Sequence, residues 1–153
     1  MKSDSNITIK EVISSDELKK FVMFPHTLYK DSKYWVAPII KEELEVLNKE
    51  TNPVFNNAIA HYFLAYIDGE IVGRIAALIN WIEVKDLKKK KVRFGWFDFI
   101  DDQNVSKALL EKVIEIGKKN NLEFIEGPVG FSNMDKAGML IKGFEKKNTM
   151  ITL

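Results

Sequence analysis

Two carboxylates are placed where acid–base chemistry could use them. Asp98 interrupts the aromatic and apolar run of residues 94–100, where a carboxylate is partly withdrawn from water. Glu126 closes a second short apolar run, directly before a Gly-Pro pair, and open sheets bind ligands at the carboxyl ends of their parallel strands. Asp98 and Glu126 are therefore the candidate catalytic residues. For Asp98 the alternative is an ion pair with Arg74 or Arg93, the only two arginines of the chain.

The segment that follows Glu126 has the composition of a binding loop. It contains Gly130, the aromatic Phe131 and two small polar residues, Ser132 and Asn133. Backbone freedom, a stacking surface and hydrogen-bonding side chains suit a loop that contacts a substrate. The alternative is a turn that only redirects the chain.

Other chemistries lack the residues that they need. The chain has no cysteine, which excludes disulfides, thiol nucleophiles and Cys-ligated metal. His26 and His61 are far apart in the sequence, so no metal site is predicted. The lysines of residues 88–91 have no aromatic residues between them, and the net charge is only +1. We expect a solvated loop there and no nucleic-acid partner.

A strand–helix–strand unit is expected to position these residues. Residues 93–100 have the composition of a strand, and residues 101–104 supply side chains that cap a helix. Apolar residues then recur at spacings of three and four and predict one buried helix face: Val105, Ala108, Leu109, Val113 and Ile116. Asn120 and Asn121 should end this helix, and a second strand begins at Phe124. Because a helix connects the two strands, they should be parallel.

The flanking segments predict further helices and a hairpin. Ser14 and Glu17 form a capping-box pattern before a helix that Pro25 should end or kink. A second helix is expected over residues 41–48, and the pair at 68–69, Asp-Gly, predicts a two-residue β-hairpin. After Asn133 we expect a short helix that Gly143 ends, and residues 149–153 have the pattern of a strand.

Composition indicates one domain over residues 1–153, with ordinary hydrophobic (46%) and charged (29%) fractions. The first residues contain no apolar leader, and the longest apolar run, 75–79, is too short to span a bilayer. We therefore expect a cytoplasmic protein without a membrane partner. The order of elements predicts an α/β (α+β) fold: a mixed, mostly antiparallel sheet with one parallel strand pair and helices on both faces.

This order of elements resembles the GCN5-related N-acetyltransferase (GNAT) superfamily. The resemblance is strongest in the stretches FPHTLYKDSKYWVAP, NPVFNNA, HYFLAYIDGEIVGRIAALIN and GPVGFSNMDKAGMLIKGF. These are similar to the N-terminal half of a longer family of bacterial acetyltransferase-like proteins. The resemblance implies that the last strands of the sheet are missing here, which would leave a strand edge near Ile125 open for a homodimer.

The resemblance also implies transfer of an acyl group from acetyl-CoA or another acyl-CoA to a small-molecule amine. The strand that matches Phe97 and Phe99 would offer backbone groups to the pantetheine arm and to the oxyanion, and the turn that matches Asn104 and Val105 would bind the pyrophosphate. In the superfamily that turn is glycine-rich, whereas here it has no glycine and carries two carboxylates at residues 101–102. The alternative is a non-catalytic or incomplete GNAT-fold module for protein interaction or small-molecule binding.

Overall fold

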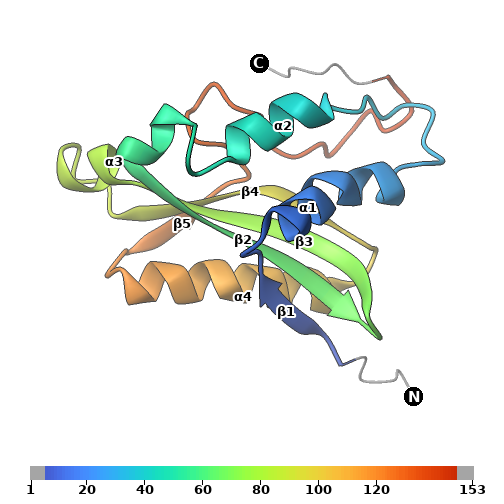
Figure 1. Cartoon of the computed structure of the whole chain (residues 1–153), viewed down its shortest axis with the longest axis horizontal. Helices are drawn as coiled ribbons and strands as arrows, with labels where there is room; N and C mark the ends of the chain where they lie inside the picture. The colour runs from blue at the N-terminus through green and yellow to red at the C-terminus, as the bar shows by residue number, and fades with distance from the viewer. Residues whose placement is uncertain (1–5, 148–153) are drawn as a thin grey trace.

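A five-stranded sheet forms the centre of the structure, a computed structural model that describes residues 6–147 (Figure 1). The strands lie side by side in chain order: β1 (Thr8–Glu11), β2 (Ala58–Ile67), β3 (Glu70–Asn80), β4 (Lys91–Phe99) and β5 (Phe124–Glu126). The first four strands are antiparallel to their neighbours, whereas β5 is parallel to β4. The predicted mixed sheet with one parallel pair is confirmed.

Helices cover both faces of this sheet. One face packs against α4 (Gln103–Lys119), the connection from β4 to β5, and the other packs against α1 (Ser15–Leu28) and α2 (Ile40–Leu47) (Figure 1). Each face has its own apolar core. Val92 and Leu109 are buried between the sheet and α4, and Phe21 and Tyr62 are buried between the sheet and α1. Two short elements, the 3-10 helix η1 (Pro53–Asn56) and the helix α3 (Trp81–Lys85), lie next to strand ends.

The local sequence patterns that start and end these elements are present as predicted. The Ser14 hydroxyl accepts the Glu17 N–H, and the Glu17 carboxylate accepts the Ser14 N–H, which completes the capping box. Asp68 and Gly69 have φ angles of 49° and 85°, as a type I′ hairpin turn requires. Asn121 follows α4 in the left-handed conformation, at φ 56°.

The expectation that Pro25 ends or kinks the first helix is wrong about the end, because α1 continues to Leu28. Proline has no N–H to donate to the carbonyl of Phe21, one turn earlier. Instead Nη1 of the buried Arg74 donates to that carbonyl oxygen at 2.8 Å. A side chain from β3 therefore supplies the hydrogen bond that the proline removes, and the helix continues.

An extra residue in β4 changes which side chains share a face. Ala76 pairs with Gly95 and Arg74 pairs with Asp98, so three steps along β4 match two steps along β3. Trp96 lies at this β-bulge with φ 46°. As a result Phe94 faces α4, whereas Trp96 and Asp98 face α1. Strict alternation along a strand predicts all three on one face, and the bulge makes that prediction wrong for Phe94.

The segment after β5 also differs from the prediction. Residues 127–147 form no helix or strand, so the short helix expected after Asn133 is wrong. The Asp135 carboxylate accepts the Ser132 N–H, and the Asp135 carbonyl accepts the Gly130 N–H, which holds the backbone in a turn. Lys91, expected in a solvated loop, is the buried first residue of β4. The strand expected over residues 149–153 lies outside the described residues.

The outer edge of β5 has no strand beside it within residues 6–147. Phe124 and Ile125 on this strand are 48% and 39% exposed. An uncovered edge with apolar side chains suits pairing with another strand. The homodimer through this edge stays a prediction.

Candidate active site

The carboxyl end of β4 is the part of the sheet that its neighbours leave open. β5 pairs only with residues 91–93. Beyond them the Val129 N–H donates to the Phe94 carbonyl at 2.8 Å, and the chain then crosses to the α1 face, where Phe131 is buried. On this side of β4, no strand of the described chain pairs with residues 96–99.

Two backbone amides are directed at this open edge. On the other side of the strand, the Ile100 N–H donates to the Val72 carbonyl of β3 at 2.9 Å. Because successive residues of a strand point their N–H groups in opposite directions, the amides of Phe99 and Phe97 point away from β3. Their side chains pack with the core beneath α4. The backbone of both residues is therefore directed at the open edge, and their contact with an acyl-CoA stays a prediction.

Asp98 is held in a polar network at the same end of the strand. Its Oδ2 accepts a hydrogen bond from Nε of Arg74 at 2.8 Å and forms an ion pair with Nη2 at the same distance, and its Oδ1 accepts a hydrogen bond from the Tyr29 hydroxyl at 2.8 Å. The Arg74 side chain is only 6% exposed. The structure thus realises the ion pair with Arg74 that was the alternative for Asp98, and both carboxylate oxygens have partners.

Tyr29 is the residue of this network that the sequence did not single out. Burial raises the pKa of its hydroxyl far above the ordinary value of 10, and the charge of Asp98 and the hydrogen bond to it raise the pKa further. Tyr29 therefore remains a protonated donor at neutral pH. Its ring also packs against Trp35, with centroids 5.3 Å apart.

The predicted loop of residues 130–133 is anchored by the second buried arginine. Arg93 donates from Nε and Nη2 to the two carboxylate oxygens of Glu83 in α3, at 3.0 and 2.5 Å. The same guanidinium donates to Oδ1 of Asn133 at 2.7 Å and to the Gly130 carbonyl at 3.3 Å. One side chain of β4 thus fixes both ends of the loop.

Phe131 of this loop and Trp96 of β4 belong to the core on the α1 side of the sheet. Phe131 packs edge-on against Phe55 and Trp96, at 5.3 and 5.8 Å between ring centroids. The Trp96 indole N–H donates to Glu43 at 2.8 Å, and Lys136 forms an ion pair with the same carboxylate. Among the loop residues, Ser132 and Asn133 are the ones left exposed. The contact of this loop with a substrate stays a prediction.

Glu126 lies well away from Asp98. Its carboxylate pairs with Nζ of Lys91 at 2.5 Å and is 46% exposed. In the strand register Glu126 is opposite Arg93. Arg93 precedes Asp98 by five residues, and one of these is the extra residue of the bulge. Four strand steps, or roughly 13 Å, therefore separate Glu126 from Asp98 along the strand direction. The structure does not bring the two candidate catalytic carboxylates together.

The first turn of α4 has little capacity left for an anion. Asp102 caps the helix: its Oδ1 accepts the Asn104 N–H at 2.8 Å, and its carbonyl accepts the N–H of Val105 at 3.1 Å. The Val105 side chain is fully buried against the sheet. Asp101 beside them is exposed and would repel a pyrophosphate. The amides predicted to bind that group are therefore occupied by the protein itself.

The histidines lie in other surroundings. Nδ1 of His61 is 2.6 Å from the Glu11 carboxylate, beside a hollow of about 220 Å³ between β1, β2 and α4. His26 packs edge-on against Trp35, and its buried Nε2 has no hydrogen-bond partner among residues 6–147. Within residues 6–147, no three His, Asp or Glu side chains are grouped to hold a metal ion. The helices of this part of the chain include none that is both long and apolar enough to cross a membrane.

Solved structures with the same arrangement of elements are acetyltransferases. An aminoglycoside acetyltransferase from an uncultured soil metagenomic sample matches 80% of this chain and 77% of its own, with a TM-score of 0.56 and 17% identity. A predicted acetyltransferase with acetyl-CoA from Clostridium acetobutylicum matches 78% of this chain and 79% of its own, with a TM-score of 0.57 and 13% identity. The chain therefore has the GCN5-related N-acetyltransferase fold.

Two curated proteins are similar in sequence. Protein YghO of Escherichia coli (strain K12) is 32% identical over 137 residues, which is 90% of this chain and 35% of that protein. The bacterial ceramide synthase of Caulobacter vibrioides is 27% identical over 144 residues, 94% of this chain and 38% of that protein. The chain thus spans little more than a third of the length of these relatives. No family model matches it.

The ion pair of Asp98 with Arg74 predicts which substitutions lower the free energy of unfolding most. Replacing Asp98 by Asn leaves the buried Arg74 without its counter-ion and should cost about 3 kcal/mol. Tyr29→Phe removes one hydrogen bond and should cost about 1 kcal/mol. Urea unfolding measures both, with the exposed Asp101→Asn as the control, expected within about 0.5 kcal/mol of the parent. An Asp98→Asn variant as stable as this control would contradict the assigned pair.

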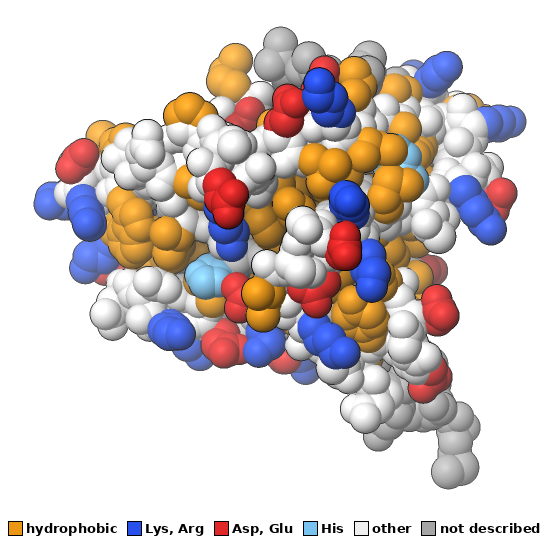
Figure 2. All heavy atoms as spheres, in the orientation of Figure 1, with side chains coloured by type: hydrophobic (Ala, Val, Ile, Leu, Met, Phe, Trp, Pro, Cys, Tyr) orange, Lys and Arg blue, Asp and Glu red, His pale blue; other side chains and the backbone are white. Residues whose placement is uncertain are grey.

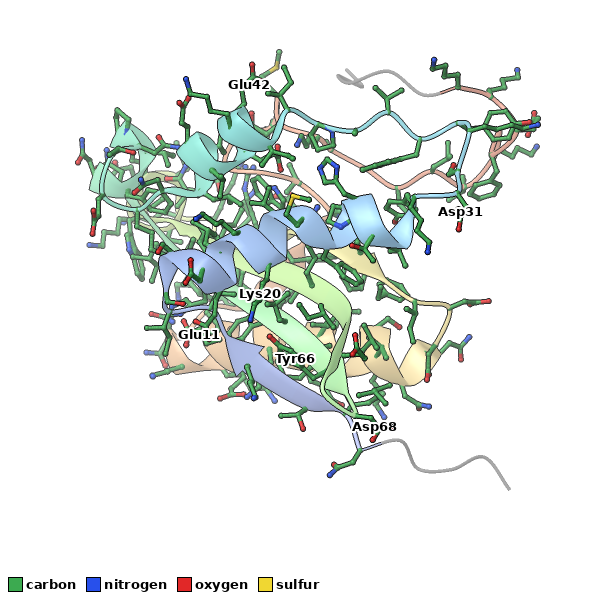
Figure 3. All side chains as sticks on the ribbon, turned by 45° about the vertical axis from the view of Figure 1, so that its right-hand side comes forward. Glu11, Lys20, Asp31, Glu42, Tyr66 and Asp68 are labelled. Carbon is green, nitrogen blue, oxygen red and sulfur yellow. The ribbon has the colours of Figure 1, made fainter. Side chains whose placement is uncertain are left out.

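The loop anchor predicts an acid-dependent stability. Burial alone would raise the pKa of Glu83, but the hydrogen bond and charge of Arg93, with a further contribution from Lys91, hold the pKa below its ordinary value of 4.5. Glu83 therefore stabilises the fold above pH 4.5, and this contribution is lost as the pH falls through the folded-state pKa. Thermal melting between neutral and acidic pH should show a smaller loss for Glu83→Gln than for the parent. Glu42→Gln, which changes an exposed carboxylate of α2 (Figure 3), should behave like the parent. Equal acid dependence in both variants would contradict the assignment.

Proposed function

We propose that this chain is the acyl-coenzyme A-binding module of an N-acyltransferase, which transfers the acyl group to an amine. The observation that carries the proposal is the open edge of β4 after the bulge, where the Phe97 and Phe99 amides have no strand beside them in the described chain. The fold supports it, because the solved structures that share this fold are acetyltransferases.

The names of the similar proteins support an amine as the acceptor. An aminoglycoside acetyltransferase and a ceramide synthase are among them, and a ceramide is the amide of a long-chain amino alcohol. The amine nitrogen would attack the thioester carbonyl, and a tetrahedral intermediate would then expel the coenzyme A thiolate. The developing oxyanion needs a donor that is already oriented, and one of the two amides, of Phe97 or of Phe99, would supply it.

Asp98 is the better placed of the two predicted carboxylates for a part in this reaction. It lies at the open end of β4, whereas Glu126 pairs with Lys91 at the closed end. Because both oxygens of Asp98 are engaged by Arg74 and Tyr29, the role that fits its contacts is to orient the Tyr29 hydroxyl on the α1 side of β4. Removal of the proton from the amine is then not assigned to Asp98.

A second function is favoured by the start of α4. Asp102 occupies the amides that a pyrophosphate would use, and Asp101 adds a second carboxylate to the same turn. A GNAT-fold module with this turn suits protein interaction or binding of a ligand without a diphosphate. The two functions differ in one measurable property, the affinity for coenzyme A.

Calorimetric titration with acetyl-CoA and with desulfo-CoA tests the proposal. We expect saturable binding, with Asp101→Asn tightening it about fivefold, because a carboxylate close to a diphosphate costs about 1 kcal/mol near water.

Glu111→Gln is the matched control. It removes one exposed carboxylate from the same helix, about 12 Å from Gln103, and should leave the affinity unchanged. The absence of heat with either ligand would overturn the transferase function in favour of the non-catalytic module. Binding that tightens equally in both charge variants would place the diphosphate elsewhere.

A further inference from the structure

The segment that ends the described chain exposes most of its large apolar side chains. Met139, Leu140, Ile141 and Phe144 are 59%, 51%, 81% and 64% exposed. They fall within six positions of one another, in a part of the chain without helix or strand. Single exposed apolar side chains are common on proteins, but such a concentration marks a surface that contacts something else.

The beginning of this segment is fixed to the rest of the molecule. The Gly138 N–H donates to the Pro128 carbonyl at 2.8 Å, and Lys136 forms an ion pair with the buried Glu43 of α2. From there the chain runs along the same side of the molecule as α2, whose exposed Glu42 is labelled in Figure 3 (Figures 1 and 3). The exposed side chains are therefore presented from an anchored base.

This segment also carries an excess of positive charge. Residues 139–147 have the sequence MLIKGFEKK, with three exposed lysines and one glutamate between and after the apolar residues. The exposed lysines of residues 88–90 form a second such excess, but beside them in the sequence only Leu87 exposes a large apolar side chain, at 57%. On the face drawn in Figure 2, acidic and basic side chains are interspersed. Since salt screens charges beyond about 8 Å, the local excess matters and the net charge of +1 for the whole chain does not.

We propose that residues 139–147 dock onto an anionic lipid bilayer. The apolar side chains would enter the boundary between headgroups and acyl chains, and Lys142, Lys146 and Lys147 would contact the anionic headgroups. A protein groove fits less well, because this segment offers neither a helix face nor a strand edge for a partner to match. This proposal departs from the expectation of no membrane partner, which is based on the short apolar runs of the sequence. The proposal does not depend on the acyl transfer.

Vesicle co-sedimentation of the whole chain tests it. Vesicles of phosphatidylcholine with about a third phosphatidylglycerol should retain the protein at millimolar lipid, and retention should fall as salt is raised. The double change Ile141→Glu with Phe144→Glu should lower retention about tenfold or more. The control is Ile13→Glu, because Ile13 is 90% exposed in the connection between β1 and α1; it should bind like the parent.

Three results would overturn the proposal. One is equal retention by pure phosphatidylcholine, another is equal loss in the Ile13 control, and the third is no retention of the parent. Size-exclusion chromatography distinguishes a second possible partner. If the parent is a dimer, the double change dissociates it and no vesicle binding is seen, the partner is a second copy of the chain. Thermal melting confirms that the variants, all at exposed positions, remain folded.

Discussion

The guanidinium of Arg74 connects the parts of this fold on which the candidate site depends. It bonds the Phe21 carbonyl that Pro25 leaves unpaired in α1, and it pairs with Asp98 on β4, which in turn holds the Tyr29 hydroxyl. A buried cation without its partner costs about 3–5 kcal/mol, a large part of the 5–15 kcal/mol that stabilises an ordinary domain. Helix α1, the bulged strand and the carboxyl end of β4 are therefore held in place together. These contacts hold the open edge in place, although no strand of the described chain pairs with it.

The bulge in β4 divides the strand into a part that anchors the loop and a part whose edge is open. Before the bulge, Arg93 anchors the loop of residues 130–133 and β5 covers the edge. After it, the side chains of Phe97 and Phe99 enter the core beneath α4, while their backbone is directed at the uncovered edge. Both arginines of this lysine-rich chain are buried on the sheet. Each uses its planar guanidinium, which can bond two acceptors at once, in a structural ion pair.

Local chemistry made much of the fold predictable. The Ser14–Glu17 capping box, the hairpin at Asp68 and the end of α4 at Asn121 each depend on residues within a few positions of one another. The predictions failed where distant residues decide the outcome. Arg74 is 53 residues from the carbonyl that it bonds, so the continuation of α1 through Pro25 could not be read from the helix alone. The partners of Asp98 are 24 and 69 residues away, and the bulge at Trp96 reassigned the faces that alternation had predicted.

Hydrogen–deuterium exchange with and without saturating desulfo-CoA tests most directly whether the open edge of β4 is the acyl-CoA site. The account predicts slower exchange in the peptide that covers residues 96–100, because the Phe97 and Phe99 amides become hydrogen-bonded to the ligand. The peptide that covers α3 (Trp81–Lys85), beyond the opposite end of β3 from the Gly73–Phe99 pair, should be unchanged. Saturating ligand without added protection at residues 96–100 would contradict the account.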